Sequence, residues 1–214
     1  MLSSLFLVLH VIAGFVTLIL FWVPMFTRKG GKAHRKVGWI YVVAMTIVAI
    51  SAFYLGMWRI FFDPDTHPDS ISFYWFLLFI SILSFATSWY GIRVLRFKGR
   101  KTTHRHPVDV GIPLLLTLSG VGISLYGNTL DSPLLTWFPL IGILLGISQL
   151  YYWLRPPAER IHWKIQHLTG LISCGIGTIT AFVVFGAPRP SNRGSPTDHL
   201  VSAHHSAHPG NHRL

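Results

Sequence analysis

Residues 159–182 read ERIHWKIQHLTGLISCGIGTITAF, and this stretch decides the fold class. It begins with charged side chains, passes His162 and His167, and then contains no ionisable side chain except Cys174. As part of an apolar run of more than eighteen residues, it is long enough to cross the hydrocarbon layer of a membrane as a helix. The end of the chain therefore predicts a membrane span that carries histidines at its charged end.

The same pattern occurs throughout the chain. We expect spans over residues 2–26, 37–58, 71–92, 108–125, 134–154 and 165–187. The runs lack the sustained alternation of barrel strands, and an open sheet in lipid would leave backbone groups unpaired. Only 12% of the residues are charged, against about 25% in an average soluble domain. The sequence predicts an all-α membrane protein, a six-helix transmembrane bundle over residues 1–187.

The last segment, residues 188–214, has a different composition. It is rich in Pro, Ser, Asn, Gly and His, a mixture that cannot bury a core, and we expect it to be a disordered tail. Its histidines would bind divalent metals weakly, but a solvated tail is the preferred interpretation.

Basic side chains are concentrated in alternate loops. Most Lys and Arg residues lie in the loops that follow the first, third and fifth expected spans, whereas the other two loops are acidic. The positive-inside rule then predicts cytoplasmic basic loops and two external termini in a bacterial inner (plasma) membrane. Anionic lipid at the inner face is a sufficient partner for the net charge of +11, so no nucleic acid is required. The first run lacks a basic start and a cleavage site, so we expect it to be an uncleaved span.

Each basic loop ends in a histidine just before the next span. The three loop ends read GKAHRKVG with His34, KTTHRHPV with His104, and AERIHWKI with His162. This likeness raises the hypothesis that the protein consists of three hairpin repeats. Parallel selection for basic loops is the alternative, because only a few residues of each loop are alike.

Histidines at the inner boundary are candidate cofactor ligands. His34, His104, His106 and His167 reach similar depths on three different return helices. Two imidazoles from different helices suit a six-coordinate b-type haem, and three with an open position suit zinc or copper. The competing interpretation is that they anchor helix ends at the lipid headgroups.

Glycine follows several of these histidines by one helical turn. Such a position leaves room for a flat macrocycle, but it also lets two helices approach closely. The three pairs are His10 with Gly14, His34 with Gly38, and His167 with Gly170.

Helical geometry separates the candidates further. His162 and His167 are five residues apart, about 140° around a helix, so both cannot face one site. We expect His167 to face inward and His162 to lie at the headgroup level. His106 and Asp109 are three residues apart, so Asp109 is expected to accept the second N–H of a ligating His106.

His10 lies alone inside the first span. An ionisable group at that depth is a functional hypothesis by default, and the alternative is a neutral imidazole bonded to a neighbouring helix. No other histidine or acid occurs at its depth in any span. We therefore expect no second haem at the outer side.

Three stretches resemble a large bacterial family of predicted multi-pass membrane proteins that is known only as a domain of unknown function. They are LHVIAGFVTLILFWVP (9–24), HRKVGWIYV (34–42) and HWKIQHLTGLISCGIGTITAFVV (162–184). The resemblance implies a multi-pass architecture and points to His10, His34 and His167. It implies no activity. The Pro-Val-Asp-Val opening of the fourth span and the histidine-rich tail have no counterpart in the family's pattern.

The leading functional hypothesis is a redox-related protein that binds one b-type haem near the cytoplasmic face. His34 and His167 are the expected axial pair, with His104 or His106 as a substitute. Electrons would then pass to or from a quinone or a membrane redox complex. The alternative is a non-catalytic membrane assembly or metal-handling factor, in which the histidines are anchors or transient ligands. The sequence predicts no catalytic residue, and the scarcity of carboxylates inside the spans disfavours coupled transport.

Overall fold

The structure is a computed structural model, and it describes residues 2–63 and 70–186. Within these residues the chain forms helices and no strands, and six helices are long and apolar enough to cross a membrane. The expected all-α architecture with six spans is confirmed. The expectation about the histidine-rich tail concerns positions outside the described residues.

The helices follow the six expected spans with small interruptions. The first span is α1 (Leu2–Leu20) with α2 (Trp22–Phe26), and the second is α3 (Lys32–Phe61). The third is α4 (Ile71–Arg93) with the 3₁₀ helix η2 (Val94–Phe97), and the fourth is α5 (Pro107–Thr129). The fifth is α6 (Pro133–Trp137) with α7 (Pro139–Leu154), and the sixth is α8 (His162–Ala181), which continues as the π-helix η3 (Phe182–Gly186).

The interruption between α1 and α2 is caused by a proline. Pro24 has no N–H to donate to Leu20, and its ring would clash with the Leu20 carbonyl in a continuous helix. The helix accordingly ends at Leu20 and restarts at Trp22. Pro24 thus fixes the direction in which the chain leaves the first span.

Some helices begin earlier than the apolar runs suggested. The expected second span starts at residue 37, whereas α3 starts at Lys32. Hydropathy detects only the apolar part of a helix, and the first turn of α3 is polar and basic. His34 therefore belongs to the helix and not to the loop.

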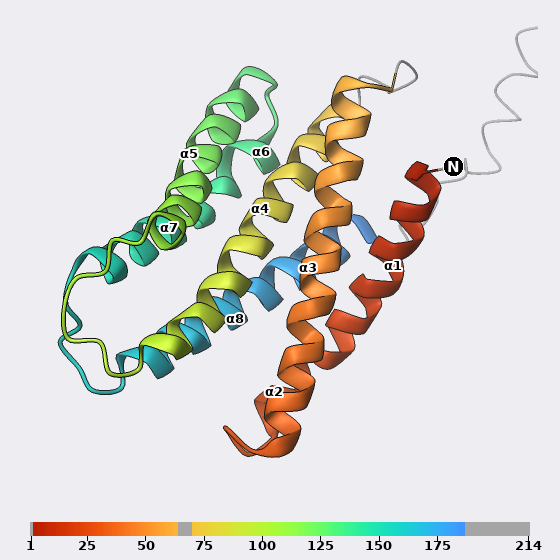
Figure 1. The fold of residues 1–214 in the computed structure, drawn as a ribbon. Helices are drawn as coiled ribbons and strands as arrows, with labels where there is room; N and C mark the ends of the chain where they lie inside the picture. The colour runs from red at the N-terminus through yellow and green to blue at the C-terminus, as the bar shows by residue number, and fades with distance from the viewer. Residues whose placement is uncertain (1, 64–69, 187–214) are drawn as a thin grey trace, which may run out of the picture.

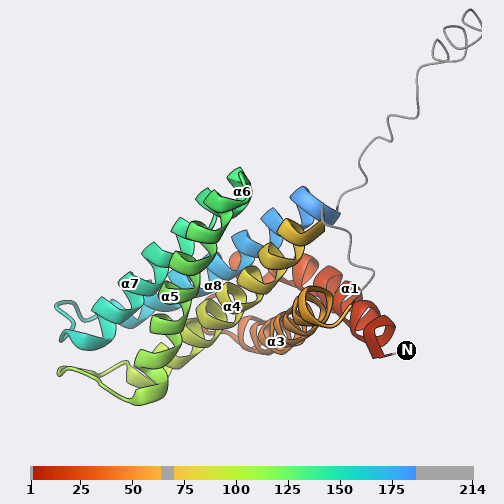
Figure 2. The same ribbon diagram turned by 90° about the horizontal axis from the view of Figure 1, so that it is seen from above.

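Helix α4 lies at the centre of the arrangement (Figure 1). It packs against α3 on one side, against α5 on the other, and against α8 on a third face, as the view from above also shows (Figure 2). Helix α1 packs mainly on α3, and α5 packs mainly on α7. The largest buried cluster joins α4, α5 and α6 through Phe76, Phe79, Leu83, Leu116 and Leu135.

These neighbours do not support the hypothesis of three hairpin repeats. The first two spans pack on one another through α1 and α3. Among the described residues, however, the backbones of α7 and α8 do not approach one another, and only side chains such as Tyr152 and His162 connect them. The fifth span instead packs on the fourth.

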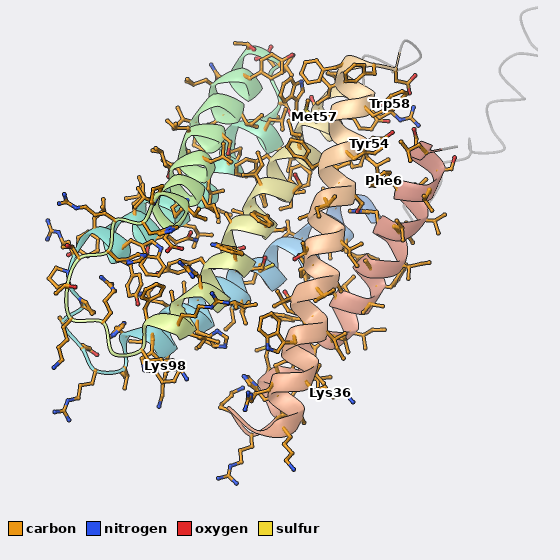
Figure 3. The ribbon with its side chains drawn as sticks, in the orientation of Figure 1. Phe6, Lys36, Tyr54, Met57, Trp58 and Lys98 are labelled. Carbon is orange, nitrogen blue, oxygen red and sulfur yellow. The ribbon has the colours of Figure 1, made fainter. Side chains whose placement is uncertain are left out.

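The two ends of the bundle differ in character (Figure 3). Lys36 and Lys98 lie at the end that carries the basic loops, and Phe6, Tyr54 and Trp58 lie toward the opposite end. There the rings of Phe6 and Tyr54 stack with their centroids 4.1 Å apart. Aromatic side chains near the end of a span are typical of a membrane interface.

A single arginine fastens the loop after η2 to the end of α7. The Arg100 guanidinium donates hydrogen bonds to the carbonyls of Tyr152 (2.7 Å) and Arg155 (2.9 Å). It also lies over the Tyr152 ring, 4.4 Å from the centroid. Carbonyls at a helix C-terminus lack partners within the helix, so Arg100 satisfies groups that would otherwise be left unpaired.

Candidate site at two facing histidines

His34 and His167 approach one another at the basic end of the bundle. His34 lies in the first turn of α3 and His167 in the second turn of α8. Their ring centroids are 6.5 Å apart, and the ring planes are inclined by 65°. Both side chains are partly buried. The structure therefore brings together the pair that the sequence analysis favoured.

The two imidazoles have the same tautomer. Nδ1 of His34 lies 3.2 Å from the carbonyl oxygen of Pro24, and Nδ1 of His167 lies 2.6 Å from the carbonyl oxygen of Gly91. A carbonyl only accepts, so both Nδ1 atoms must carry the proton. In the neutral form of each ring, Nε2 is then unprotonated and able to bind a metal. A bond from the other ring nitrogen to a backbone carbonyl is the usual way in which proteins orient a ligating histidine.

The partner of His167 is available because α4 and α8 cross closely. A Cβ built on Gly170 would lie 2.8 Å from Cα of Gly91 and 2.9 Å from the Thr87 carbonyl oxygen. Such a short separation requires glycine on both helices, Gly91 on α4 and Gly170 on α8. His167 lies one turn before this crossing. The Gly91 carbonyl, in the last turn of α4, is thereby within reach of the imidazole.

The glycines that follow the histidines therefore differ from one another. The space beside Gly170 is occupied by the backbone of α4, so this glycine serves the close approach of two helices. Gly14 and Gly38 have no atom within 4 Å of the place where a Cβ would be. Only Gly38 offers open space one turn from the His34–His167 pair.

A buried layer lies above the pair between α3 and α8. Tyr41 and Met45 follow His34 by seven and eleven residues, and Cys174 and Thr178 follow His167 by the same intervals. Helical residues at these intervals share a face. Tyr41, Met45 and Cys174 form one buried cluster, and the Thr178 hydroxyl lies 3.4 Å from the Met45 sulfur. Cys174 is fully buried there, in agreement with a packing role.

His104 and His106 lie in a different place, around Asp109. The Asp109 side chain is fully buried and accepts two bonds from the Arg93 guanidinium, at 2.8 and 2.9 Å. It accepts a third from Nε2 of His104 at 2.7 Å. Nδ1 of His106 is 3.8 Å away, beyond hydrogen-bond distance. The expectation that Asp109 orients His106 is therefore wrong, and the carboxylate holds Arg93 and His104 instead.

Neither His104 nor His106 is placed to act as a ligand together with His34 or His167. The His104 ring is packed against Phe97 and Trp153, with centroid distances of 4.4 and 4.9 Å, and its Nε2 is occupied by Asp109. The side chain of His106 is half exposed. The geometry thus does not favour either of them as a substitute for His34 or His167.

His10 is far from the pair. Its Nδ1 lies 3.1 Å from the Ser51 hydroxyl oxygen and 3.3 Å from the Val48 carbonyl. Ser51 is 17 positions after His34 in α3, which corresponds to about 25 Å along the helix. His10 connects α1 to α3, which is the alternative that the sequence analysis offered.

His162 is buried inside the protein and not exposed at a surface. Its Nδ1 lies 2.9 Å from the Tyr152 hydroxyl. One turn later Gln166 accepts a bond of 2.6 Å from the Tyr90 hydroxyl. His162 and Gln166 are four residues apart and share a helix face, and their tyrosine partners could not be identified from local sequence.

Within residues 2–63 and 70–186, no group of three or more His, Cys, Asp or Glu side chains could hold a metal ion. The His34–His167 pair is thus a site with two protein donors. No family model, curated protein or solved structure matches this chain. The resemblance to a family of unknown function therefore stays a prediction.

Proposed function

We propose that this chain is a multi-pass membrane protein that binds one b-type haem between His34 and His167 and serves in electron transfer. The observation that carries the proposal is the facing pair itself, with two rings 6.5 Å apart and both Nδ1 atoms donating to carbonyls. Haem iron would supply the one-electron chemistry. The protein supplies the ligands, their orientation and their surroundings.

The separation of the rings would allow His34 and His167 to hold one iron between them. A histidine nitrogen lies about 2.0–2.1 Å from a bound metal ion, and the ring centroid lies about 1.1 Å behind it. Two opposed imidazoles therefore have centroids about 6.3 Å apart. The observed separation of 6.5 Å is close to this value.

The number of donors favours haem over a bare metal ion. Protein zinc sites use three or four protein ligands. Haem iron receives four nitrogens from the macrocycle and needs only one or two axial side chains. Among the described residues, His34 and His167 have no third His, Cys, Asp or Glu beside them. Two donors are enough for haem iron but too few for a zinc site.

A macrocycle also needs space beside its ligands. Gly170 is filled by α4, whereas Gly38 faces open space, so the proposal assigns the porphyrin edge to the Gly38 side of α3. The two carbonyls accept hydrogen bonds from the Nδ1–H groups, which raises the electron density of each ring. Both Nε2 atoms thereby become more basic. This favours firm axial ligation.

The expected topology gives the side of the membrane on which the haem would lie. If the basic loops are cytoplasmic, the haem lies near the inner face of a bacterial plasma membrane. A quinone in the bilayer or a membrane redox complex would then be the electron partner. The membrane face at which the haem lies and the electron partner are both parts of this proposal.

An optical spectrum of the detergent-purified full chain tests the proposal. Expression with ample haem should give a Soret band, and dithionite should produce sharp α and β bands of low-spin haem. His34→Ala and His167→Ala should each abolish the low-spin spectrum.

His104→Ala is the matched control, because it removes a histidine at the same end of the bundle and leaves the pair intact. It should retain the low-spin spectrum. A wild-type protein without these bands would sink the proposal, and so would ligand variants that keep them.

A further inference from the structure

A groove runs along the outside of the first two spans, between α1 and α3. It encloses about 460 Å³ and is lined only by apolar side chains. Ala13 and Ala44 form its floor and are both 7% exposed. Its walls are larger and largely exposed side chains, namely Leu9, Ile12 and Val16 of α1 and Trp39, Ile40, Val43 and Ile47 of α3.

The α3 wall of this groove continues into a row of cations. Residues 32, 36, 40, 43 and 47 are separated by three or four positions, so they lie on one helix face. Ile40, Val43 and Ile47 line the groove, and Lys32 and Lys36 precede them on the same face. Arg35 stands one turn before Trp39 in the same way.

Among the described residues, Lys32, Arg35 and Lys36 have no hydrogen-bond or ion-pair partner. Lys29 is engaged by the Pro24 and Met25 carbonyls at 2.7 and 2.8 Å. The side chains of Arg28, Lys32, Arg35 and Lys36 make no hydrogen bond or ion pair with any other described residue and are exposed. An apolar groove that ends at unpaired cations matches a molecule with a hydrocarbon chain and an anionic head.

The dimensions agree with one chain of a membrane lipid. From Lys36 to Ile47 the helix rises by about 16 Å, close to the roughly 15 Å thickness of one hydrocarbon leaflet. A neutral isoprenoid tail would fit the groove but would leave the cations unmatched.

We propose that the α1–α3 groove holds one acyl chain of an anionic phospholipid, whose phosphate is bound by Lys32, Arg35 and Lys36. This site is separate from the His34–His167 pair and does not depend on haem binding. Juxtamembrane lysine and arginine attract anionic lipid, and the groove adds selectivity for a chain at one position. The phospholipid would fill the gap that α1 and α3 leave above their alanine floor.

Trp39, a wall of the groove that is 59% exposed, is a natural reporter. The full chain is reconstituted into vesicles of phosphatidylcholine containing increasing amounts of dibrominated phosphatidylglycerol or dibrominated phosphatidylcholine. Bromine quenches tryptophan fluorescence on contact, and subtraction of a Trp39→Phe variant isolates the Trp39 signal. We expect the anionic lipid to quench this signal at an about tenfold lower mole fraction than the neutral lipid.

Two variants test the two halves of the site. Lys32→Gln combined with Lys36→Gln should remove the preference for the anionic lipid, and Ala44→Leu should fill the floor and reduce quenching by both lipids. The matched controls are Arg96→Gln with Lys101→Gln on another basic loop, and Val121→Leu on an exposed part of α5. Both controls should behave like the wild type.

Equal quenching of the wild type by both lipids would overturn the proposal. The same holds if the lysine variant keeps its preference. Should a second copy of the chain cover the groove, Trp39 would be shielded from both lipids and the protein would run as a dimer, which also contradicts the proposal.

Discussion

Gly170 of α8 lies directly against Gly91 of α4, so closely that a Cβ on Gly170 would be 2.8 Å from Cα of Gly91. The contact is between backbones, and no flexible side chain could move aside to relieve it. We therefore expect Gly170→Ala to force the helices apart and to lower the free energy of unfolding by about 1–3 kcal/mol. Unfolding in mixed detergent micelles by added SDS measures this.

The matched control for this prediction is Gly122→Ala in α5. Gly122 has no atom within 4 Å of its missing Cβ, so alanine should raise stability by about 0.5–1 kcal/mol through its better helix propensity. If Gly170→Ala and Gly122→Ala changed the free energy of unfolding by similar amounts, the crossing of α4 and α8 would not require glycine. The Gly170 variant should also weaken the bond from His167 to the Gly91 carbonyl.

A second prediction concerns the space beside the paired histidines. Gly38→Leu places a side chain in the open volume one turn from His34, and we expect the haem-to-protein ratio to fall several-fold. Gly14→Leu fills an equally open position one turn from His10 and should leave the ratio unchanged. Pyridine haemochrome absorbance per mole of folded protein measures both. Equal ratios in the two variants would argue against a macrocycle on the Gly38 side.

A third prediction concerns the buried carboxylate. Asp109→Asn removes the charge that holds Arg93 and His104, and we expect stability to fall by about 3 kcal/mol because a guanidinium is left without its partner. Replacing Arg93 and Asp109 together by leucine should cost less than this single change. A double variant as unstable as the sum of its single variants would refute the pairing. Folded Asp109→Asn protein should still bind haem.

A fourth prediction concerns the clamp on α7. Arg100→Lys keeps the charge but cannot reach the Tyr152 and Arg155 carbonyls with a planar fork, so we expect a loss of about 2 kcal/mol. Arg96→Lys, in η2 just before that loop and exposed, should change stability by less than about 0.5 kcal/mol. Thermal unfolding followed by circular dichroism compares the two. An Arg100 variant as stable as the Arg96 variant would show that the clamp is dispensable.

The six spans could be predicted because each is a long apolar run, and this property is local. The pairing of the spans could not, because it depends on small residues such as Gly91 and Gly170. Those glycines resemble the many other glycines of the membrane segments, and only the packed structure distinguishes a glycine that touches a neighbouring helix from one that faces open space.

The candidate site was partly predictable for the same reason. The depth of His34 and His167 in their spans could be counted from sequence. Their approach in space depends also on how α3 and α8 are placed, and His104, at a similar depth, lies elsewhere beside Asp109. The mistaken link between His106 and Asp109 came from applying helical spacing to a residue outside the helix. His106 has an extended backbone before α5 begins, and Arg93 from the preceding span reaches the carboxylate with two bonds.

The orienting groups of the proposed ligands are main-chain atoms, the carbonyl oxygens of Pro24 and Gly91. Both carbonyls belong to the last turn of a helix, where backbone acceptors lack partners. Alanine scanning changes side chains and leaves such acceptors in place. A mutational scan should therefore find His34 and His167 intolerant to substitution without revealing any side chain that bonds to them. The support of the site would appear only at positions that set the course of the backbone, such as Gly170.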